Sequence, residues 1–208
     1  CDLLINIGAR LHDRITGKID EFSPKSKKVH IDIDPSSINK IIKVDLSIVG
    51  DVSDVISSTT KTLKKKKLNL EKSNKQKISN WWQQIEKWRT KQSLSFVNSD
   101  TIIKPQYAVQ RLYELTKDSD TYITTEVGQH QMWAAQHYKF SKPNRWMTSG
   151  GLGTMGYGLP AAIGVQVAHP KRLVIDIAGE AFILMNIQEL STAGQYRIPV
   201  KIFILNNE

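Results

Sequence analysis

The last 36 residues, 173–208, constrain the fold most, because they read as a strand, a helix and a second strand. Residues 173–177 form a short apolar run rich in β-branched side chains, which predicts a buried strand. Gly179 interrupts this run, apolar residues at helical spacing follow, and after Pro199 residues 200–205 form a second apolar run. Such a unit normally makes a right-handed crossover between parallel strands, so the sequence predicts an α/β protein.

Polar residues that can bind a metal follow both of these predicted strands. Glu180 comes after the first strand, and Asn206 and Asn207 come after the second. The carboxyl ends of parallel strands share one edge of a sheet, which is where open α/β sheets bind ligands. The helix between the strands would aim its N-terminus at an anion. Mg²⁺ with a diphosphate suits this arrangement, because Mg²⁺ takes few protein ligands and fills its shell with phosphate oxygens and water.

Two further junctions of strand and helix resemble this one. Residues 121–127 and 146–148 are predicted strands; Gln129 and His130 follow the first, although a polar residue there can simply cap a helix. Residues 150–158 hold five glycines, which cost chain entropy unless the backbone needs unusual angles or touches a ligand. We expect the junctions to converge on one cofactor site, formed by Gly128–His130, Gly150–Met155, Gly179–Phe182 and Asn207.

The N-terminal part has the pattern of a nucleotide-binding domain. Residues 1–8, 29–33 and 44–49 are predicted strands, each followed by glycine or by polar residues. Asp32 stands near the end of the second strand, where an acid often holds a ribose hydroxyl. Arg10 could bind a phosphate, but a surface charge is the simpler interpretation. The sequence therefore predicts a doubly wound domain here.

Between these two regions lies a basic, polar segment. Residues 1–104 carry 20 Lys and Arg against 12 Asp and Glu, so they account for most of the net charge of +9. Without a recognition motif, a solvated helix explains this segment better than nucleic-acid binding. Residues 64–76 are the predicted interdomain linker. Tryptophans at helical spacing further on predict a face packed on a neighbour, formed by Trp81, Trp82, Ile85 and Trp88.

Composition excludes some classes of protein. No apolar run approaches the roughly 20 residues needed to span a bilayer, so we expect no membrane segment. Cys1 is the only cysteine, which excludes an internal disulfide and favours a reducing, cytoplasmic compartment. The chain starts without Met and stops directly after a predicted strand, so we interpret it as an interior piece of a longer protein.

The motifs resemble those of the thiamine diphosphate enzymes, which carry Gly-Asp-Gly and, further on, Asn-Asn. Here Gly-Glu-Ala at 179–181 precedes Asn-Asn at 206–207 by 24 residues. The closest similarity is to the catalytic subunit of acetolactate synthase (acetohydroxyacid synthase). Six segments carry it, at residues 8–18, 29–35, 50–52, 127–138, 149–164 and 185–190.

The resemblance implies a domain organisation and site residues. It implies the C-terminal part of a central FAD-type domain at 1–60, a helical linker at 61–104 and a truncated thiamine-diphosphate domain at 105–208. Thiamine diphosphate would contact Gln129, His130, Gly153, Met155, Glu180, Ala181, Phe182 and Asn207, and Glu180 and Asn207 would bind Mg²⁺. FAD would contact Gly8, Ala9, Arg10, Leu11, His12, Asp32, Ile33, Asp51 and Val52. The activating glutamate of the family would lie upstream, so these residues include no catalytic one.

The implied reaction is decarboxylation of pyruvate and carboligation to a second 2-keto acid. The product would be 2-acetolactate or 2-aceto-2-hydroxybutyrate, in the first step of branched-chain amino-acid biosynthesis. The family implies a homodimer or larger assembly with a shared active site, a possible small regulatory subunit, and an isolated fragment that is inactive. The alternatives are a glyoxylate carboligase, a catabolic FAD-free acetolactate synthase and a non-catalytic paralogue.

Three residues depart from the family pattern. Glu180 stands where Asp is usual, Phe182 replaces a small hydroxyl residue, and His12 replaces a common Asp. Because Mg²⁺ is geometrically strict, we expect Glu180 to bind it only after a small backbone or rotamer adjustment.

Overall fold

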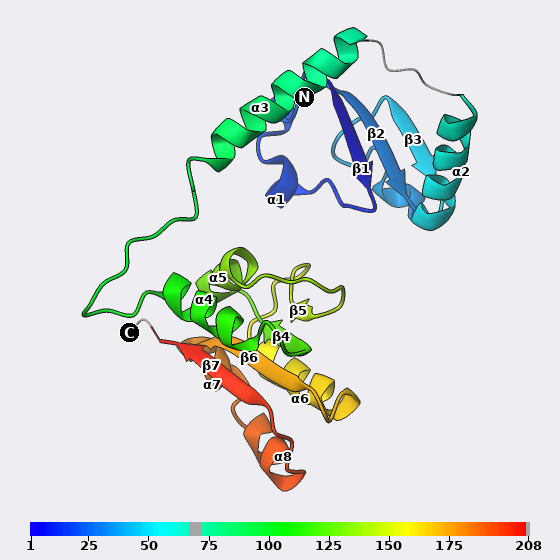
Figure 1. Ribbon diagram of the computed structural model, residues 1–208. Helices are drawn as coiled ribbons and strands as arrows, with labels where there is room; N and C mark the ends of the chain where they lie inside the picture. The colour runs from blue at the N-terminus through cyan, green and yellow to red at the C-terminus, as the bar shows by residue number, and fades with distance from the viewer. Residues whose placement is uncertain (67–71, 207–208) are drawn as a thin grey trace. The chain divides into compact units, whose positions relative to one another are not determined.

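The computed structural model describes residues 1–66 and 72–206, with the side chains of 72 and 73 excepted. It divides into two compact units, Cys1–Lys87 and Trp88–Glu208, whose boundary falls inside the predicted linker segment 61–104 (Figure 1). Among the described residues, no helix combines the length and the apolar character that a membrane crossing requires.

The first unit contains a parallel sheet of three strands in the order β1-β2-β3, so the three predicted strands are confirmed. Its elements are β1 (Leu3–Ile7), α1 (Asp13–Thr16), β2 (Lys27–Asp32), β3 (Leu46–Val49) and α2 (Val52–Lys65), with single 3-10 turns at Ile19–Glu21 and Pro35–Ser37. Helix α3 (Lys72–Arg89) begins in this unit and ends just past its boundary at Lys87. The large apolar side chains of β1, Leu3, Ile5 and Ile7, are 44–54% exposed.

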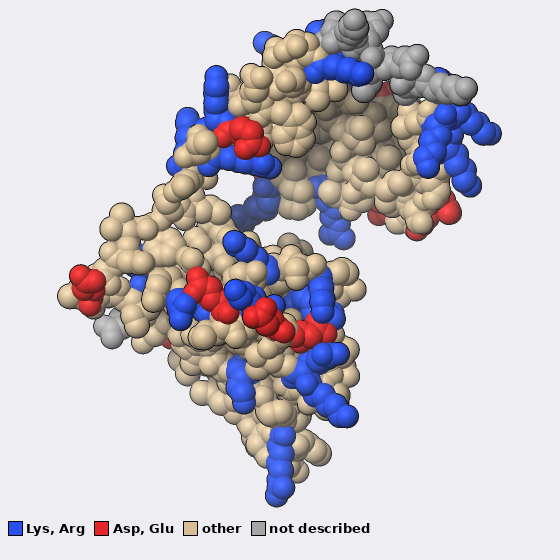
Figure 2. Space-filling model, viewed as in Figure 1, with Lys and Arg blue, Asp and Glu red and all other residues tan. Residues whose placement is uncertain are grey.

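The basic segment is helical and exposed where it is described. Asp51 caps α2 by accepting from the backbone N–H groups of Ser53 and Asp54, which fixes the start of this helix. Side chains 61–66 are all exposed, as expected for a solvated helix, and Figure 2 shows Lys and Arg gathered over the end of α2.

The predicted linker at 64–76 is helical over most of the part that the structure describes, and whether it links two domains stays a prediction. Residues 64 and 65 still belong to α2, residues 67–71 lie outside the described residues, and residues 72–76 belong to α3. This stretch of α3 is polar but contains neither Pro nor Gly, and Lys and Gln are good helix formers. The tryptophan face of α3 was predicted to be packed, yet Trp81, Trp82 and Trp88 are 49–55% exposed.

The second unit contains a parallel sheet of four strands in the order β5-β4-β6-β7. Its elements are α4 (Pro105–Thr116), β4 (Thr121–Thr125), α5 (Gln129–His137), β5 (Trp146–Thr148), α6 (Gly158–Ala168), β6 (Leu173–Gly179), α7 (Glu180–Met185), α8 (Glu189–Gln195) and β7 (Lys201–Leu205). Strands β6 and β7 run parallel with Gly179 opposite Leu205, so the predicted parallel pairing at the end of the chain is confirmed.

Helices bury both faces of this sheet (Figure 1). On one face Ile123, Ile175 and Ile177 pack with Val109 of α4 and Ala134 of α5. The other face packs against α6, α7 and α8 through Leu159, Ile163, Ala178, Ile183 and Ala193. Successive strand residues point to opposite faces, so Asp176 lies on the α6 side with Val174 and Ala178.

The helix predicted between β6 and β7 is interrupted, so its prediction as one element is wrong. Helix α7 ends at Met185 and α8 begins at Glu189. At the break, the side-chain amide of Asn186 donates a hydrogen bond of 2.6 Å to the carbonyl of Gly156 in the glycine-rich segment. The break therefore attaches this segment to the end of α7.

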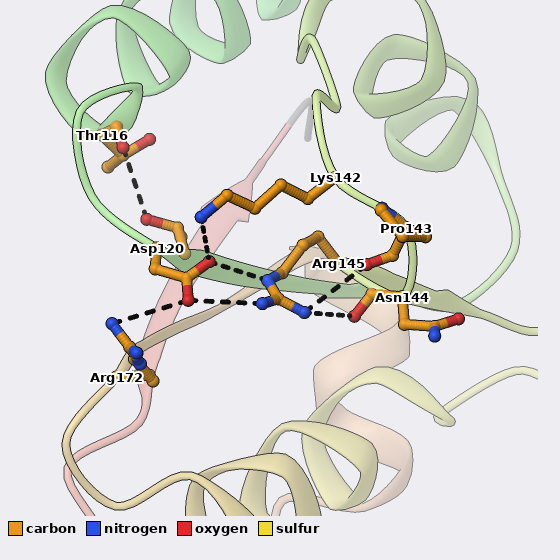
Figure 3. Close-up of polar contacts among 8 residues, drawn as sticks. Thr116, Asp120, Lys142, Pro143, Asn144, Arg145 and Arg172 are labelled. Atoms are coloured by element: carbon orange, nitrogen blue, oxygen red, sulfur yellow. Dashed lines mark hydrogen bonds and ion pairs between the residues drawn. The ribbon is translucent and has the colours of Figure 1, made fainter.

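Charged residues join the strand starts at the opposite, amino edge of the sheet (Figure 3). Asp120 precedes β4 and accepts from Arg145, which precedes β5, at 2.8 and 3.3 Å. Lys142 lies 3.2 Å and Arg172, which precedes β6, 3.5 Å from the same carboxylate. The hydrogen bonds from Arg145 hold the pKa of Asp120 at about 2, well below its ordinary value. These contacts explain the aligned strand starts, and they lie far from the carboxyl edge where ligands are expected.

Candidate functional site

A pocket of about 270 Å³ lies at the carboxyl edge of the second sheet. Residues from the junctions after β4 and β6 line it together, and these are two of the four junctions that were predicted to converge. The lining residues are Gly128, Gln129, His130, Trp133, Gly179, Glu180, Phe182 and Leu205.

Two glycines keep the wall of this pocket open. Gly128 has φ +127°, and a Cβ atom there would lie 3.0 Å from Cε1 of His130. A Cβ atom on Gly179 would lie 2.9 Å from the ring of Phe182 and 3.2 Å from Nδ1 of His130. Gly128 is also the N-cap of α5 and supplies no side-chain cap, so the first N–H groups of α5 remain available. An uncapped helix N-terminus beside a bare backbone suits an anion such as a phosphate group.

His130 is a buried, neutral group at this pocket. It is 3% exposed, and burial lowers its pKa to about 4, while Glu180 opposes that shift. Its Nε2 atom lies 3.7 Å from Oε1 of Glu126 and has no hydrogen-bond partner. Its Nδ1 atom lies on the side of Gly128 and Gly179, and the ring packs on Phe182 with centroids 5.0 Å apart. A neutral imidazole carries one N–H, which can be donated to an anion without adding a buried charge.

Glu180 is the predicted metal ligand that the structure describes. It begins α7 and lines the pocket, whereas Asn207, the second predicted ligand, lies outside the described residues. Within those residues no group of three or more His, Cys, Asp or Glu side chains could hold a metal ion. A carboxylate and an amide beside a phosphate site are enough for Mg²⁺, which keeps water and phosphate in its shell. Ala181 follows on α7 and is exposed.

The glycine-rich segment adjoins the pocket through its backbone. Gly153 has φ +70°, and its Cβ position lies 3.5 Å from the side chain of Val127, at the end of β4. Met155 is 45% exposed and does not line the pocket. The segment ends at Gly158, whose N–H donates to Oε2 of Glu126 at 3.0 Å. The third predicted junction therefore contacts the chain just past the end of β4, and Met155 stays outside the cavity.

Two buried acids at this edge were missed by the sequence reasoning. Glu126 is 1% and Asp176 0% exposed, and burial raises the pKa of each to about 7. Thr124 donates to Asp176 at 2.9 Å. A signal was present for Asp176, which interrupts the apolar run 173–177 of a predicted buried strand, where an unpaired charge is costly. Glu126 follows two threonines and gave no such signal.

The FAD residues predicted for the first unit gather at the carboxyl edge of its sheet. Arg10, Leu11 and His12 line a cavity of about 320 Å³, together with Asp34, Ser36, Ser37, Lys40 and Ile41. Gly8 has φ +65°, and its Cβ position lies 3.7 Å from the side chain of Val52. The loop carrying Arg10 thus lies beside the start of α2.

The other predicted FAD residues serve the local backbone or face outward. Asp32 accepts from the N–H of Asp34, Asp51 caps α2, and the carbonyl of Ala9 accepts from Asn6. Ile33 is 68% exposed. Six of the predicted FAD residues do not line the cavity, namely Gly8, Ala9, Asp32, Ile33, Asp51 and Val52.

Comparisons with protein families identify both units. Residues 126–208 match the C-terminal TPP-binding domain of thiamine pyrophosphate enzymes, and residues 1–59 match their central domain. The chain belongs to the thiamine pyrophosphate enzyme family. The pocket at Gly128, His130 and Glu180 lies within the matched TPP-binding domain, whose cofactor is thiamine diphosphate under its other name.

Individual relatives of this thiamine pyrophosphate enzyme chain are similar over nearly all of its length. The chain is 46% identical to the acetolactate synthase large subunit of Haemophilus influenzae, over 99% of this chain and 35% of that protein. It is 46% identical to the acetolactate synthase isozyme 3 large subunit of Escherichia coli, with the same coverage. It is 47% identical to the acetolactate synthase large subunit of Porphyra purpurea, over 100% of this chain and 34% of that protein. The chain thus spans about a third of the length of these relatives.

Proposed function

We propose that the full-length protein is the catalytic subunit of an acetolactate synthase. It decarboxylates pyruvate and joins the remaining two carbons to a second 2-keto acid, giving 2-acetolactate or 2-aceto-2-hydroxybutyrate for branched-chain amino-acid biosynthesis. The observation that carries this proposal is the pocket between Gly128 and Glu180 at the carboxyl edge of a TPP-binding domain. The names of the similar large subunits supply the reaction.

The described residues fit the diphosphate end of the cofactor. A volume of about 270 Å³ is small for a complete cofactor, so this pocket takes the diphosphate while the rest extends outward past Gly153 and Met155. The first N–H groups of α5, at Gln129 and His130, donate to phosphate oxygens. His130 stays neutral because it is buried, so it donates without requiring a counter-charge.

Glu180 and Asn207 would hold Mg²⁺ beside these phosphate oxygens. Glu180 is one methylene longer than the usual Asp, so its carboxylate reaches the metal by a change of rotamer. Phe182 supplies no hydroxyl donor and instead shields His130 from water. When bound, thiamine diphosphate supplies the electron sink for loss of CO₂. The part played by these residues is to bind and orient the cofactor, and to exclude water from its diphosphate end.

FAD is proposed for the first unit, in the cavity lined by Arg10, Leu11 and His12. A cavity of about 320 Å³ with one Arg and one Lys suits a phosphate group and part of a nucleotide. We propose that Asp32 and Ile33 contact FAD from β2, and Asp51 and Val52 from the start of α2. Flavin absorbance in the purified full-length protein would support this proposal, and a colourless protein would contradict it.

The active site is proposed to be completed by a second subunit. The activating glutamate is assigned to residues upstream of this chain and to the partner of a homodimer or larger assembly. A small regulatory subunit is proposed because the similar proteins are named large subunits. A cytoplasmic location is proposed because the single cysteine, Cys1, favours a reducing compartment.

The reaction is tested by incubating the full-length protein with pyruvate, thiamine diphosphate and Mg²⁺. Acetolactate formation with release of one CO₂ per product is the expected result. Glyoxylate as the preferred substrate would instead identify a glyoxylate carboligase, and activity without bound flavin a catabolic acetolactate synthase. Cofactor binding without CO₂ release would indicate a non-catalytic paralogue.

A further inference from the structure

Two carboxyl groups share one buried space beneath the diphosphate pocket. Glu126 comes from the end of β4 and Asp176 from the middle of β6, and both are essentially inaccessible to water. Both side chains point at Gly158, the first residue of α6. A Cβ atom on Gly158 would lie 2.0 Å from Oε2 of Glu126 and 2.3 Å from Oδ1 of Asp176. One oxygen of each acid therefore lies against the same point of the backbone.

Few polar groups lie near these two acids to offset the free-energy cost of burying their carboxyl groups. Glu126 accepts from the N–H of Gly158 at 3.0 Å, and Asp176 accepts from the hydroxyl of Thr124 at 2.9 Å. The second oxygen of Asp176 has no hydrogen-bond partner. Within the described residues neither acid forms an ion pair with Lys or Arg. The remaining titratable neighbour is His130, at 3.7 Å from Glu126, and α6 contributes no titratable side chain.

Two ionised carboxylates in this space would repel each other without a cation to balance them. Burial disfavours the charged form of an acid, and a like charge nearby disfavours it further. Both effects act here, because burial raises the pKa of Glu126 and Asp176 and the charge of Glu126 adds to the shift of Asp176. His130 does not supply the missing charge, because its own burial keeps it neutral.

We propose that Glu126 and Asp176 share one proton, and that this acid–carboxylate pair positions the first turn of α6 and the ring of His130 beneath the diphosphate pocket. They are positioning residues, since neither lines the pocket. The pair titrates as a unit, so the proton belongs to both acids. Its link to cofactor binding rests on the proposed function.

The proton makes the cofactor site sensitive to alkaline pH. Because the folded pKa values of the pair are raised above the unfolded ones, the folded state holds a proton that the unfolded state releases between about pH 4 and pH 7. Stability therefore falls as pH rises through that window, and loss of the last shared proton separates the two acids. A diphosphate bound above them favours the protonated pair, so affinity for the cofactor falls as pH rises above about 7, where the unoccupied pair loses its proton.

The test compares Glu126→Gln with wild type in the full-length protein. Glutamine keeps the shape of Glu126, accepts from Gly158 and donates to Asp176, so it replaces the shared proton permanently. We measure the dissociation constant of thiamine diphosphate with saturating Mg²⁺ from pH 6.5 to 8.5. In wild type this constant is expected to rise at least about fivefold over that range. Loss of one proton allows a change of at most about tenfold per pH unit. In the variant the constant is expected to stay within about twofold after correction for titration of the free cofactor.

Glu114→Gln is the matched control, because Glu114 lies on α4 and pairs with Arg111 and Gln110. Its profile should follow that of wild type, and identical profiles for wild type and Glu126→Gln would overturn the proposal. If Glu126→Gln does not fold, Asp176→Asn is used instead, because it replaces the other acid of the pair by the amide of the same shape. If wild type binds no thiamine diphosphate, the proposed function fails. The shared proton is then tested by measuring the midpoint of thermal unfolding as a function of pH. A midpoint that changes equally with pH in wild type and in Glu126→Gln contradicts the shared proton.

Discussion

Replacing Gly158 by Ala tests the packing beneath the cofactor pocket with a single methyl group. The new Cβ atom would meet Oε2 of Glu126 at 2.0 Å and Oδ1 of Asp176 at 2.3 Å. Contacts below 3.0 Å do not persist, so both acids or the start of α6 must move by about 1 Å. The hydrogen bond from the Gly158 N–H to Glu126 is then lost or stretched.

The cost follows from three terms. Overpacking a buried site costs about 1–3 kcal/mol, and losing a hydrogen bond to a charged group costs about 1.5–3 kcal/mol. The higher helical propensity of Ala than of Gly stabilises the variant by at most about 1 kcal/mol, which offsets part of this loss. The net loss is on the order of 3 kcal/mol, or roughly 6–12 °C in the unfolding midpoint of a domain of this size.

Gly164→Ala is the control in the same helix. Its Cβ position meets nothing within 4 Å and the residue is exposed, so this change should stabilise by roughly 0.5–1 kcal/mol. Differential scanning fluorimetry of the full-length protein measures both variants, and amide hydrogen exchange locates the effect at α6. The reasoning is refuted if Gly158→Ala is as stable as Gly164→Ala. A double-mutant cycle with Glu126→Ala should recover part of the loss, because one of the two colliding atoms is gone.

Three further changes test other contacts. Asn186→Ala removes the hydrogen bond to the glycine-rich segment and should cost about 1 kcal/mol in unfolding free energy; an unchanged denaturation midpoint would contradict this. Arg145→Lys loses the two-nitrogen contact with Asp120, so the pKa of Asp120 rises from about 2. The ionised carboxylate of Asp120 stabilises the fold above its unfolded pKa, and this stabilisation is lost as pH falls towards 2. Because the folded pKa of Asp120 is higher in the variant, acid unfolding should begin at a higher pH there. Phe182→Ala uncovers His130, whose pKa should rise from about 4 towards 6.5 in an NMR titration.

The sheet framework could be predicted because its signals are local. The apolar run of β6, the Pro that begins α4 and the junction at Gln129 each specify an element from neighbouring residues alone. The parallel order then follows from the alternation of strand and helix.

Features set by distant contacts could not be predicted. The break after α7 is set by a hydrogen bond between Asn186 and Gly156, which are 30 residues apart. Glu126, which follows β4, and Asp176 of β6 both lie against Gly158, and no spacing in the sequence indicates this. Helical spacing gives the face that Trp81 and Trp82 share, but it does not show whether anything covers that face.

The glycine-rich segment was predicted either to need unusual backbone angles or to touch a ligand, and its glycines differ in role. Gly153 and Gly156 adopt positive φ, and Gly158 packs against two carboxyl groups. Gly150 and Gly151 contact nothing within 4 Å of a Cβ position. A run of glycines therefore indicates that unusual backbone is needed without indicating at which residue.

The central claim is that the carboxyl edge of the second sheet binds a diphosphate through a metal at Glu180. The most direct measurement is calorimetric titration of the full-length protein with thiamine diphosphate, with Mg²⁺ and after its removal by chelation. Binding should require Mg²⁺, and Glu180→Ala should weaken it at least roughly 100-fold, or about 3 kcal/mol. Binding that is independent of the metal, or unchanged in Glu180→Ala, would contradict the assignment.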